Sequence, residues 1–149
     1  MVMTILGIDP GMTGAIAMVQ PMVDVWDMPA TVQDLATLLK TFDPATTRVY
    51  LENVHSMPGQ GVSSTFKFGV GFGQIQGVLA TLGFPYILVE PSKWKTAMGL
   101  RGKEKAESRA LAQRLFPTAS LSRVRDHGRA EALLIAEFGR RKGDQEALL

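Results

Sequence analysis

A short apolar stretch near the N-terminus ends in a carboxylate, and this feature most limits the folds open to the chain. Met3–Ile8 is apolar and partly β-branched, as in an interior strand, and Asp9 interrupts it. Pro10 and Gly11 then favour a tight turn into a second apolar run over 15–19. A charge beside a buried strand is costly to desolvate, so Asp9 needs a cation, amide donors or water at an open sheet end. The simpler alternative is a solvated aspartate in a turn.

The remaining apolar pattern predicts a mixed α/β sheet. Strands are expected at 3–8, 15–19, 23–28, 49–51 and 86–89, and helices at 32–42, 64–82, 104–116 and 128–141, with a loop or short helix over 92–103 and loops over 56–64 and 118–125. The first three strands are closely connected, which favours an antiparallel meander, whereas strands that follow helices are expected to run parallel to the first. We therefore predict a five-stranded mixed sheet, three antiparallel strands followed by βα units, with helices on both faces. The whole is expected to form one domain, 1–149.

Three glycines recur at every fourth position of the long helix expected over 64–82. They are Gly69, Gly73 and Gly77. Each costs about 1 kcal/mol relative to alanine in a helix interior. A smooth stripe of this kind suits close approach of the sheet or of a partner helix.

Composition excludes several classes of site. The 149 residues include no cysteine, so disulfides, thiolate zinc sites, iron–sulfur clusters and cysteine nucleophiles are ruled out. No apolar run reaches transmembrane length, and the N-terminus does not resemble a signal peptide. The expectation is a cytoplasmic protein without membrane contact.

Charge is unevenly distributed along the chain. Residues 1–92 carry a net charge of −4, whereas residues 93–142 carry +8. A basic C-terminal half favours a polyanionic partner, most often nucleic acid, although solvated helix faces are the alternative. The densest basic run contains Lys93, Lys95, Arg101, Lys103 and Lys105, which could contact phosphates.

Three acidic residues interrupt apolar segments. Asp9 and Glu52 end strands, where ligands of parallel sheets gather, and Glu131 lies in the apolar start of the last helix. His127 precedes Glu131 by one helical turn and Asp126 lies next to it. Clustered carboxylates repel one another and suit Mg²⁺ or Mn²⁺, and two such ions about 4 Å apart can support phosphodiester hydrolysis. Taken singly, Glu131 could instead be a first-turn acid, Asp126 an N-cap and His127 an exposed imidazole.

Taken together, these motifs resemble the RuvC-type Holliday junction resolvases in their short bacteriophage-like form. The likeness rests on Gly-Ile-Asp-Pro-Gly at 7–11, on the strand that ends at Glu52, and on Asp-His-Gly-Arg-Ala-Glu-Ala-Leu-Leu-Ile-Ala at 126–136. It extends over Pro-Ser-Lys-Trp-Lys at 91–95 and Gly-Lys-Glu-Lys at 102–105, and so covers nearly the whole chain. The resemblance implies an RNase H-like fold, a homodimer, and a nuclease that uses divalent metal to nick two strands of a four-way DNA junction symmetrically.

The resemblance also implies roles for individual residues. Asp9, Glu52 and Glu131 match three of the four metal-binding acids, although the last acid is commonly aspartate in the family. The fourth ligand lies three or four residues before that acid. Gly128 cannot ligate, so His127 is favoured and Asp126 stays open. Two Mg²⁺ ions, with Mn²⁺ also accepted, are expected in each site.

The resemblance extends to DNA contacts. Phe66 and Phe68 are candidates for stacking at the junction crossover, with core packing as an equal alternative. Arg129 borders the acidic site together with Arg123 and Arg125, and is a candidate DNA contact. Trp94 is expected in the core.

Two other functions fit parts of the sequence. Glu131 in place of the usual aspartate keeps open a junction-binding protein that cleaves weakly or not at all. The hairpin Asp-Pro-Gly-Met-Thr-Gly at 9–14 also resembles the phosphate loop of actin-like ATPases, but that fold needs a second nucleotide-binding lobe that 149 residues cannot supply.

Overall fold

The computed structural model describes residues 2–56 and 58–147. Its strands are β1 Thr4–Asp9, β2 Ala15–Gln20, β3 Asp24–Asp27, β4 Thr47–Glu52 and β5 Tyr86–Val89; its α-helices are α1 Val32–Leu39, α2 Val62–Thr81, α3 Pro91–Ala97, α4 Lys105–Leu115 and α5 His127–Ala147; short 3₁₀ helices cover Pro44–Thr46 and Val124–Asp126. The predicted loop over 56–64 includes residue 57, and the predicted domain 1–149 includes residues 1, 148 and 149; these four residues lie outside the described part of the chain.

The five strands form one mixed sheet, in the order β3-β2-β1-β4-β5. β1 pairs antiparallel with β2, and β2 with β3, so the first three strands form the expected meander. β1 pairs parallel with β4, and β4 with β5. The predicted fold class, three antiparallel strands followed by βα units, is therefore confirmed.

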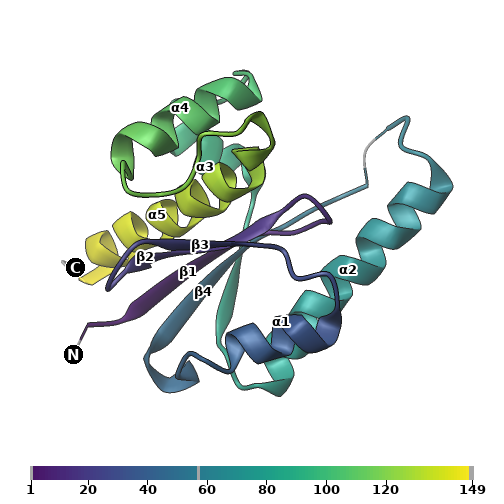
Figure 1. Ribbon diagram of the computed structural model, residues 1–149, viewed down its shortest axis with the longest axis horizontal. Coiled ribbons are helices and arrows are strands. Elements are labelled where there is room, and N and C mark those ends of the chain that lie inside the picture. The colour runs from purple at the N-terminus through teal and green to yellow at the C-terminus, as the bar shows by residue number, and fades with distance from the viewer. Residues whose placement is uncertain (1, 57, 148–149) are drawn as a thin grey trace.

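Helices cover both faces of this sheet. Figure 1 shows α3, α4 and α5 on one side and α1 and α2 on the other. Along β1 the side chains alternate, so Leu6 and Ile8 belong to the core under α1 and α2 whereas Ile5 belongs to the core under α5. Asp9 has the same parity as Ile5 and therefore faces α5. By the same alternation in β4, Glu52 shares the α5 face with Tyr50.

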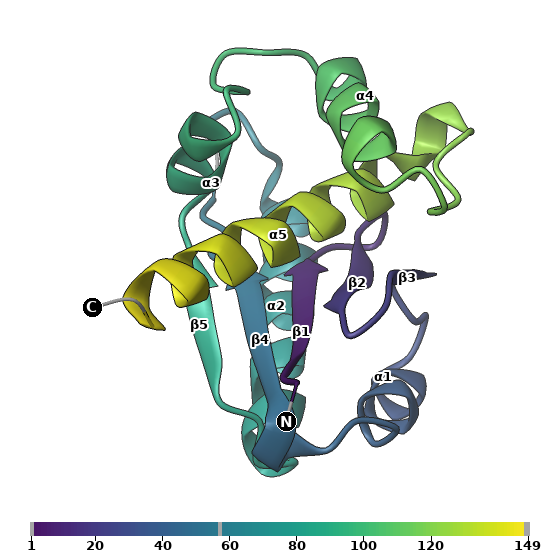
Figure 2. The same ribbon diagram turned by 90° about the vertical axis from the view of Figure 1, so that its left-hand side faces the viewer.

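α5 lies directly on the sheet, crossing in front of β4 and β1 in Figure 2. Gly7 makes this approach possible, because a Cβ there would meet the backbone nitrogen of Ala136 at 2.5 Å. Gly139 similarly leaves room for the ring of Tyr50. These two glycines allow the close contact between helix and sheet that the sequence analysis expected from other positions.

The glycine stripe of α2 does not pack on the sheet. A Cβ added at Gly69, Gly73 or Gly77 would meet no atom within 4 Å in the described structure. The expectation of sheet packing is therefore wrong for this stripe, because the helix turns Ile75 and Leu79 to the sheet instead. Packing against a partner helix stays a prediction.

Most helix boundaries differ from the prediction by one or two residues, but α1 ends three residues early and α5 continues to Ala147, six residues beyond its predicted end. α1 ends at Leu39, before the expected Phe42, because the N–H of Phe42 bonds to the Leu39 carbonyl in a tight turn. The ambiguous segment after β5 begins with helix α3, which buries Trp94. In the described residues, no helix combines the length and the apolar character needed to cross a membrane.

Candidate active site

Two carboxylates lie side by side where β1 and β4 end. The parallel register pairs Ile8 with Leu51, so Asp9 and Glu52 are the next residues along neighbouring strands. Both are nearly buried, with 9% of Asp9 and 8% of Glu52 exposed. Strand alternation therefore delivers two acids to one edge of the sheet, on the face covered by α5.

Glu131 adds a third carboxylate from the first part of α5. Burial raises the pKa of Asp9 well above its usual value, and the nearby charges of Glu131 and Glu52 raise it further. A hydrogen bond between the carboxyl groups of Asp9 and Glu131, which requires a shared proton, acts in the same direction. The positive charge of Lys105 opposes these effects. The structure thus brings together the three acids that the sequence singled out.

Glu52 has one fixed polar partner. The indole Nε1–H of Trp94 donates a hydrogen bond of 2.7 Å to Glu52 Oε2. Burial raises the pKa of Glu52, whereas this hydrogen bond and the charge of Lys95 lower it. Trp94 is fully buried, as expected for a core residue, but the sequence analysis missed its polar contact.

Asp126 is engaged in its own turn. Arg123 donates to Asp126 from its backbone N–H at 2.9 Å and from its guanidinium at 2.7–3.2 Å. These bonds hold the pKa of Asp126 below its usual value, despite the opposing effect of burial. Only 1% of Asp126 is exposed. Its two oxygens therefore stabilise the 3₁₀ turn before α5. This structural role is similar to the N-cap that the sequence offered as an alternative to metal binding.

His127 begins α5, one turn before Glu131. Its side chain is partly exposed, and Nδ1 lies 3.4 Å from the carbonyl oxygen of Val124. The next residue, Gly128, packs against the backbone of Thr13 in the β1–β2 turn. This contact places the start of α5 next to the turn that follows Asp9.

The donor set suits a hard divalent cation. Carboxylate oxygens from Asp9, Glu52 and Glu131 are ligands that Mg²⁺ and Mn²⁺ prefer. Within the described residues, no three His, Asp or Glu side chains form a ready cluster for a metal ion. Burial and the two neighbouring carboxylates raise the pKa of Asp9, and a bound cation would stabilise its ionised form.

The predicted basic run follows β5 and lines the same end of the sheet. Lys93, Arg101, Lys103 and Lys105 are exposed, and Lys95 is partly buried. Lys105 and Lys95 are close enough to act on the pKa values of Asp9 and Glu52 respectively. Lys95 and Lys105 therefore border the acidic site.

Arg129 has different surroundings from those lysines. Its guanidinium makes two hydrogen bonds to Asp27, at 2.7 and 3.1 Å, and one to the carbonyl oxygen of Ser120. Only 17% of its side chain is exposed. In the described structure Arg129 ties α5 to β3, and its role in DNA contact stays a prediction.

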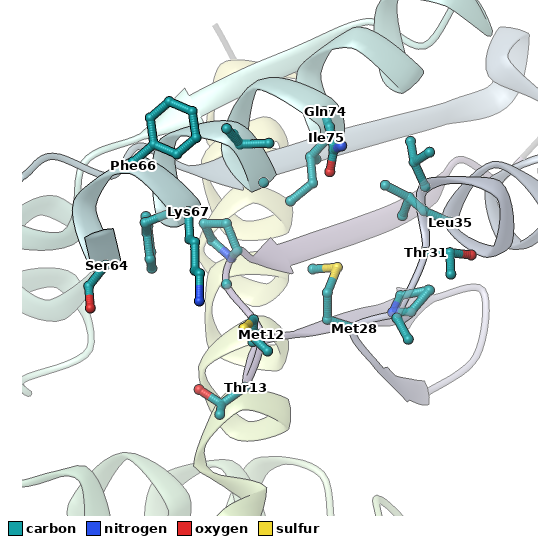
Figure 3. Close-up of a pocket in the computed structure, with 18 of the residues that line it drawn as sticks. Met12, Thr13, Met28, Thr31, Leu35, Ser64, Phe66, Lys67, Gln74 and Ile75 are labelled. Carbon is teal, nitrogen blue, oxygen red and sulfur yellow. The ribbon is translucent and has the colours of Figure 1, made fainter. Parts of the chain in front are cut away.

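The two aromatic candidates lie beside an open groove of about 830 Å³ between α2, the β1–β2 turn and the segment before α1 (Figure 3). Phe66 is 72% exposed at the start of α2. Phe68 is partly buried and packs towards Gly11 in the β1–β2 turn. The exposed ring of Phe66 is therefore available for stacking, whereas the ring of Phe68 packs against the protein.

Comparison with known proteins gives three likenesses. No protein-family model matches the chain. The Holliday junction resolvase MOC1, chloroplastic, of Chlamydomonas reinhardtii is 38% identical over 92 residues, which are 60% of this chain. The chain spans only 10% of the length of that relative.

Two similar solved structures cover nearly the whole chain. T. thermophilus RuvC in complex with a Holliday junction substrate has a TM-score of 0.66 and 18% identity, over 96% of this chain and 97% of the other. A second Thermus thermophilus RuvC structure has a TM-score of 0.61 and 20% identity over the same shares. The chain therefore has the RNase H-like fold of RuvC, and its resemblance to the RuvC-type Holliday junction resolvases is confirmed.

Proposed function

We propose that this protein is a metal-dependent, structure-selective endodeoxyribonuclease that resolves four-way DNA junctions by paired symmetric nicks. One observation carries the proposal: Asp9 and Glu52 are buried side by side at the ends of parallel strands, and Glu131 faces them from α5. Such a group of carboxylates is costly for folding, and a RuvC fold surrounds it. Bound metal ions would offset the free-energy cost of burying these carboxylates.

In this proposal Asp9, Glu52 and Glu131 hold two Mg²⁺ ions, with His127 as the fourth ligand in preference to Asp126. Bound ions would stabilise negative charge on the attacking and leaving oxygens of a phosphodiester. His127 is favoured because it starts the helix that carries Glu131, whereas the Asp126 oxygens are used by Arg123. The near-burial of Asp9 and Glu52 limits the access of bulk water to their oxygens.

Branched DNA is the proposed substrate because exposed positive charge borders the acids. Lys93, Lys95, Arg101, Lys103 and Lys105 would contact phosphates along the strand that is cut. Phe66 would stack on a base at the crossover, since its ring is largely exposed on the same side as the β1–β2 turn.

A homodimer is the proposed assembly, because two nicks related by symmetry need two sites. The start of α2 exposes Val62, Phe66 and Val70 at spacings of four residues, next to the open glycine stripe. Sedimentation of the wild type should give a dimer at micromolar concentration, and Gly73→Leu should weaken it. A wild-type monomer under these conditions would contradict the assembly.

A second candidate is a protein that binds junctions without cleaving them. Glu131 supports it, because its side chain is one methylene longer than the aspartate usual in the family. Metal-dependent cleavage separates the two candidates. The cytoplasmic setting and the bacteriophage-like character stay predictions of the sequence.

The test uses a labelled four-way junction with and without Mg²⁺. The wild type should nick it only with metal. Asp9→Asn and Glu52→Gln should bind the junction and leave it intact, because each removes a ligand oxygen but little volume. Nicking by Asp9→Asn at the wild-type rate and low metal would contradict the assignment of the site.

A further inference from the structure

The indole of Trp94 makes an unusual contact for a core side chain. Trp94 has no exposed surface and packs with Leu100 and Phe116 among the buried residues under α5. A buried indole N–H needs an acceptor, and here the acceptor is Glu52 Oε2, at 2.7 Å. A hydrogen bond to an ionised carboxylate is shorter and stronger than one to a neutral acceptor.

The backbone fixes this contact from both sides. β4 and β5 are parallel neighbours, and their register pairs Glu52 with Val89. The ladder continues one step further, because the N–H of Asn53 donates to the Val89 carbonyl at 2.8 Å. α3 begins two residues after Val89 and carries Trp94 in its first turns. The indole is therefore held in register with the end of β4.

A cation adds to the strength of the donor. The Nζ of Lys95 lies 5.5 Å from the centroid of the Trp94 ring. A positive charge over the ring attracts its electrons and makes the indole N–H a better donor. The hydrogen bond uses one oxygen of Glu52, Oε2, and leaves the other oxygen, Oε1, outside the contact with the indole.

We propose that Trp94 is a positioning residue that orients Glu52 for metal binding. Its N–H holds Oε2 in place, so that Oε1 keeps a fixed direction and can bind a divalent ion together with Asp9. Partners of this kind around metal ligands affect metal affinity by about 10–100-fold. The inference rests on the proposed function for its consequence in cleavage, but the hydrogen bond and its effect on metal binding can be measured without DNA.

The hydrogen bond is tested first in the metal-free protein. The chain has two tryptophans, so a ¹⁵N-labelled sample should give two indole N–H signals, and Trp26→Phe assigns them. Glu52→Gln should move the Trp94 signal and speed its exchange with deuterated water. The Trp26 signal should not change, because Trp26 packs on Phe42, away from the site. A Trp94 signal that is the same in Glu52→Gln would overturn the inference.

The effect on metal is tested by calorimetric titration with Mn²⁺. Trp94→Phe removes the N–H and should weaken binding by about 10–100-fold, and excess Mg²⁺ should restore cleavage towards the wild-type rate. Trp26→Phe is the matched control and should bind Mn²⁺ like the wild type. A folded Trp94→Phe protein with wild-type Mn²⁺ affinity would overturn the inference.

A second variant avoids the cavity that Trp94→Phe leaves in the core. In the Trp26→Phe background, benzothienylalanine at position 94 keeps the ring size but has sulfur in place of Nε1–H. It should reproduce the loss of Mn²⁺ affinity while leaving thermal stability nearly unchanged, and unaltered affinity would overturn the inference. If the wild type binds Mn²⁺ and loses affinity in these variants but never nicks a junction, the proposed function fails while the role of Trp94 stands.

Discussion

Gly128 in α5 packs against the carbonyl oxygen of Thr13 so closely that a Cβ at position 128 would overlap it. The Cα of Gly14 lies 3.2 Å from the same Cβ position. Thr13 and Gly14 belong to the turn that follows Asp9, and Gly128 lies between His127 and Glu131 in sequence. This contact therefore sets the distance between the acid of β1 and the acid of α5.

Gly128→Ala should consequently damage both folding and cleavage. The added methyl group pushes α5 from the β1–β2 turn, and overpacking of this kind costs about 1–3 kcal/mol in the free energy of unfolding. Urea unfolding measures this loss in the free energy of unfolding. Gly71→Ala is a matched control, because Gly71 lies in α2 outside the glycine stripe and its Cβ would meet open space; this variant should stabilise the helix by about 0.5–1 kcal/mol. Equal stability and nicking in Gly128→Ala and the wild type would refute this account of the contact.

His127 and Asp126 should respond differently to mutation. His127→Ala removes a proposed ligand from a partly exposed position, so nicking should fall sharply at unchanged thermal stability. Asp126→Asn loses charge-assisted hydrogen bonds from Arg123 and should cost about 1–3 kcal/mol in stability, while the folded fraction still cleaves. Junction nicking against Mg²⁺ concentration, beside thermal unfolding, distinguishes them. The opposite pattern would assign the fourth ligand to Asp126.

Junction binding should depend strongly on salt, because lysines that contact phosphates release counterions. Replacing Lys103 and Lys105 together with alanine should flatten the plot of log affinity against log salt concentration by about one to two units. The matched control replaces Lys40 and Lys142, which lie away from the acidic site. If both double variants keep the wild-type slope, the DNA surface does not include this run.

Glu137 should make stability depend on pH. Burial raises its pKa, but hydrogen bonds from Arg140 and Arg141 outweigh that effect and hold the pKa below 4.5. Because the folded-state pKa is the lower one, the stabilisation is complete above about pH 4.5 and disappears as pH falls through the folded-state pKa. Glu137→Gln should cost about 1–2 kcal/mol at neutral pH, since both arginines are partly exposed to solvent.

Thermal unfolding at several pH values checks this prediction. The difference between wild type and Glu137→Gln should shrink as the solution becomes more acidic than about pH 4.5. Glu146→Gln, an exposed position on the same helix, is the control and should differ little from the wild type at any pH. A difference that stays constant into acid would show that the charge of Glu137 contributes nothing.

The sequence predicts the sheet and its two strand-end acids well, because both follow from local pattern. A continuous apolar run defines β1, and a polar residue where that run stops marks the sheet edge. Asp9 and Glu52 were found in this way. The turn at Pro10 and Gly11 is equally local, since it depends on the conformations those two residues allow.

Contacts between distant segments could not be read from local pattern. Arg129 binds Asp27, 102 positions away, and Trp94 binds Glu52, 42 positions away. Both depend on how β3, α3 and α5 pack. The spacing of four residues suggested that the glycines of α2 pack on the sheet or on a partner helix. The direction of each helix face decides between these alternatives, and a Cβ at Gly73 would meet open space rather than the sheet.

The most direct test of the account is cleavage of a supercoiled plasmid that extrudes a cruciform, which is a four-way junction. With Mg²⁺ the wild type should convert the plasmid to the linear form by two nicks made at one junction. Asp9→Asn should bind the cruciform and leave the plasmid supercoiled. A plasmid that stays supercoiled with wild-type protein and Mg²⁺, or becomes linear equally fast with Asp9→Asn, would contradict the central claim.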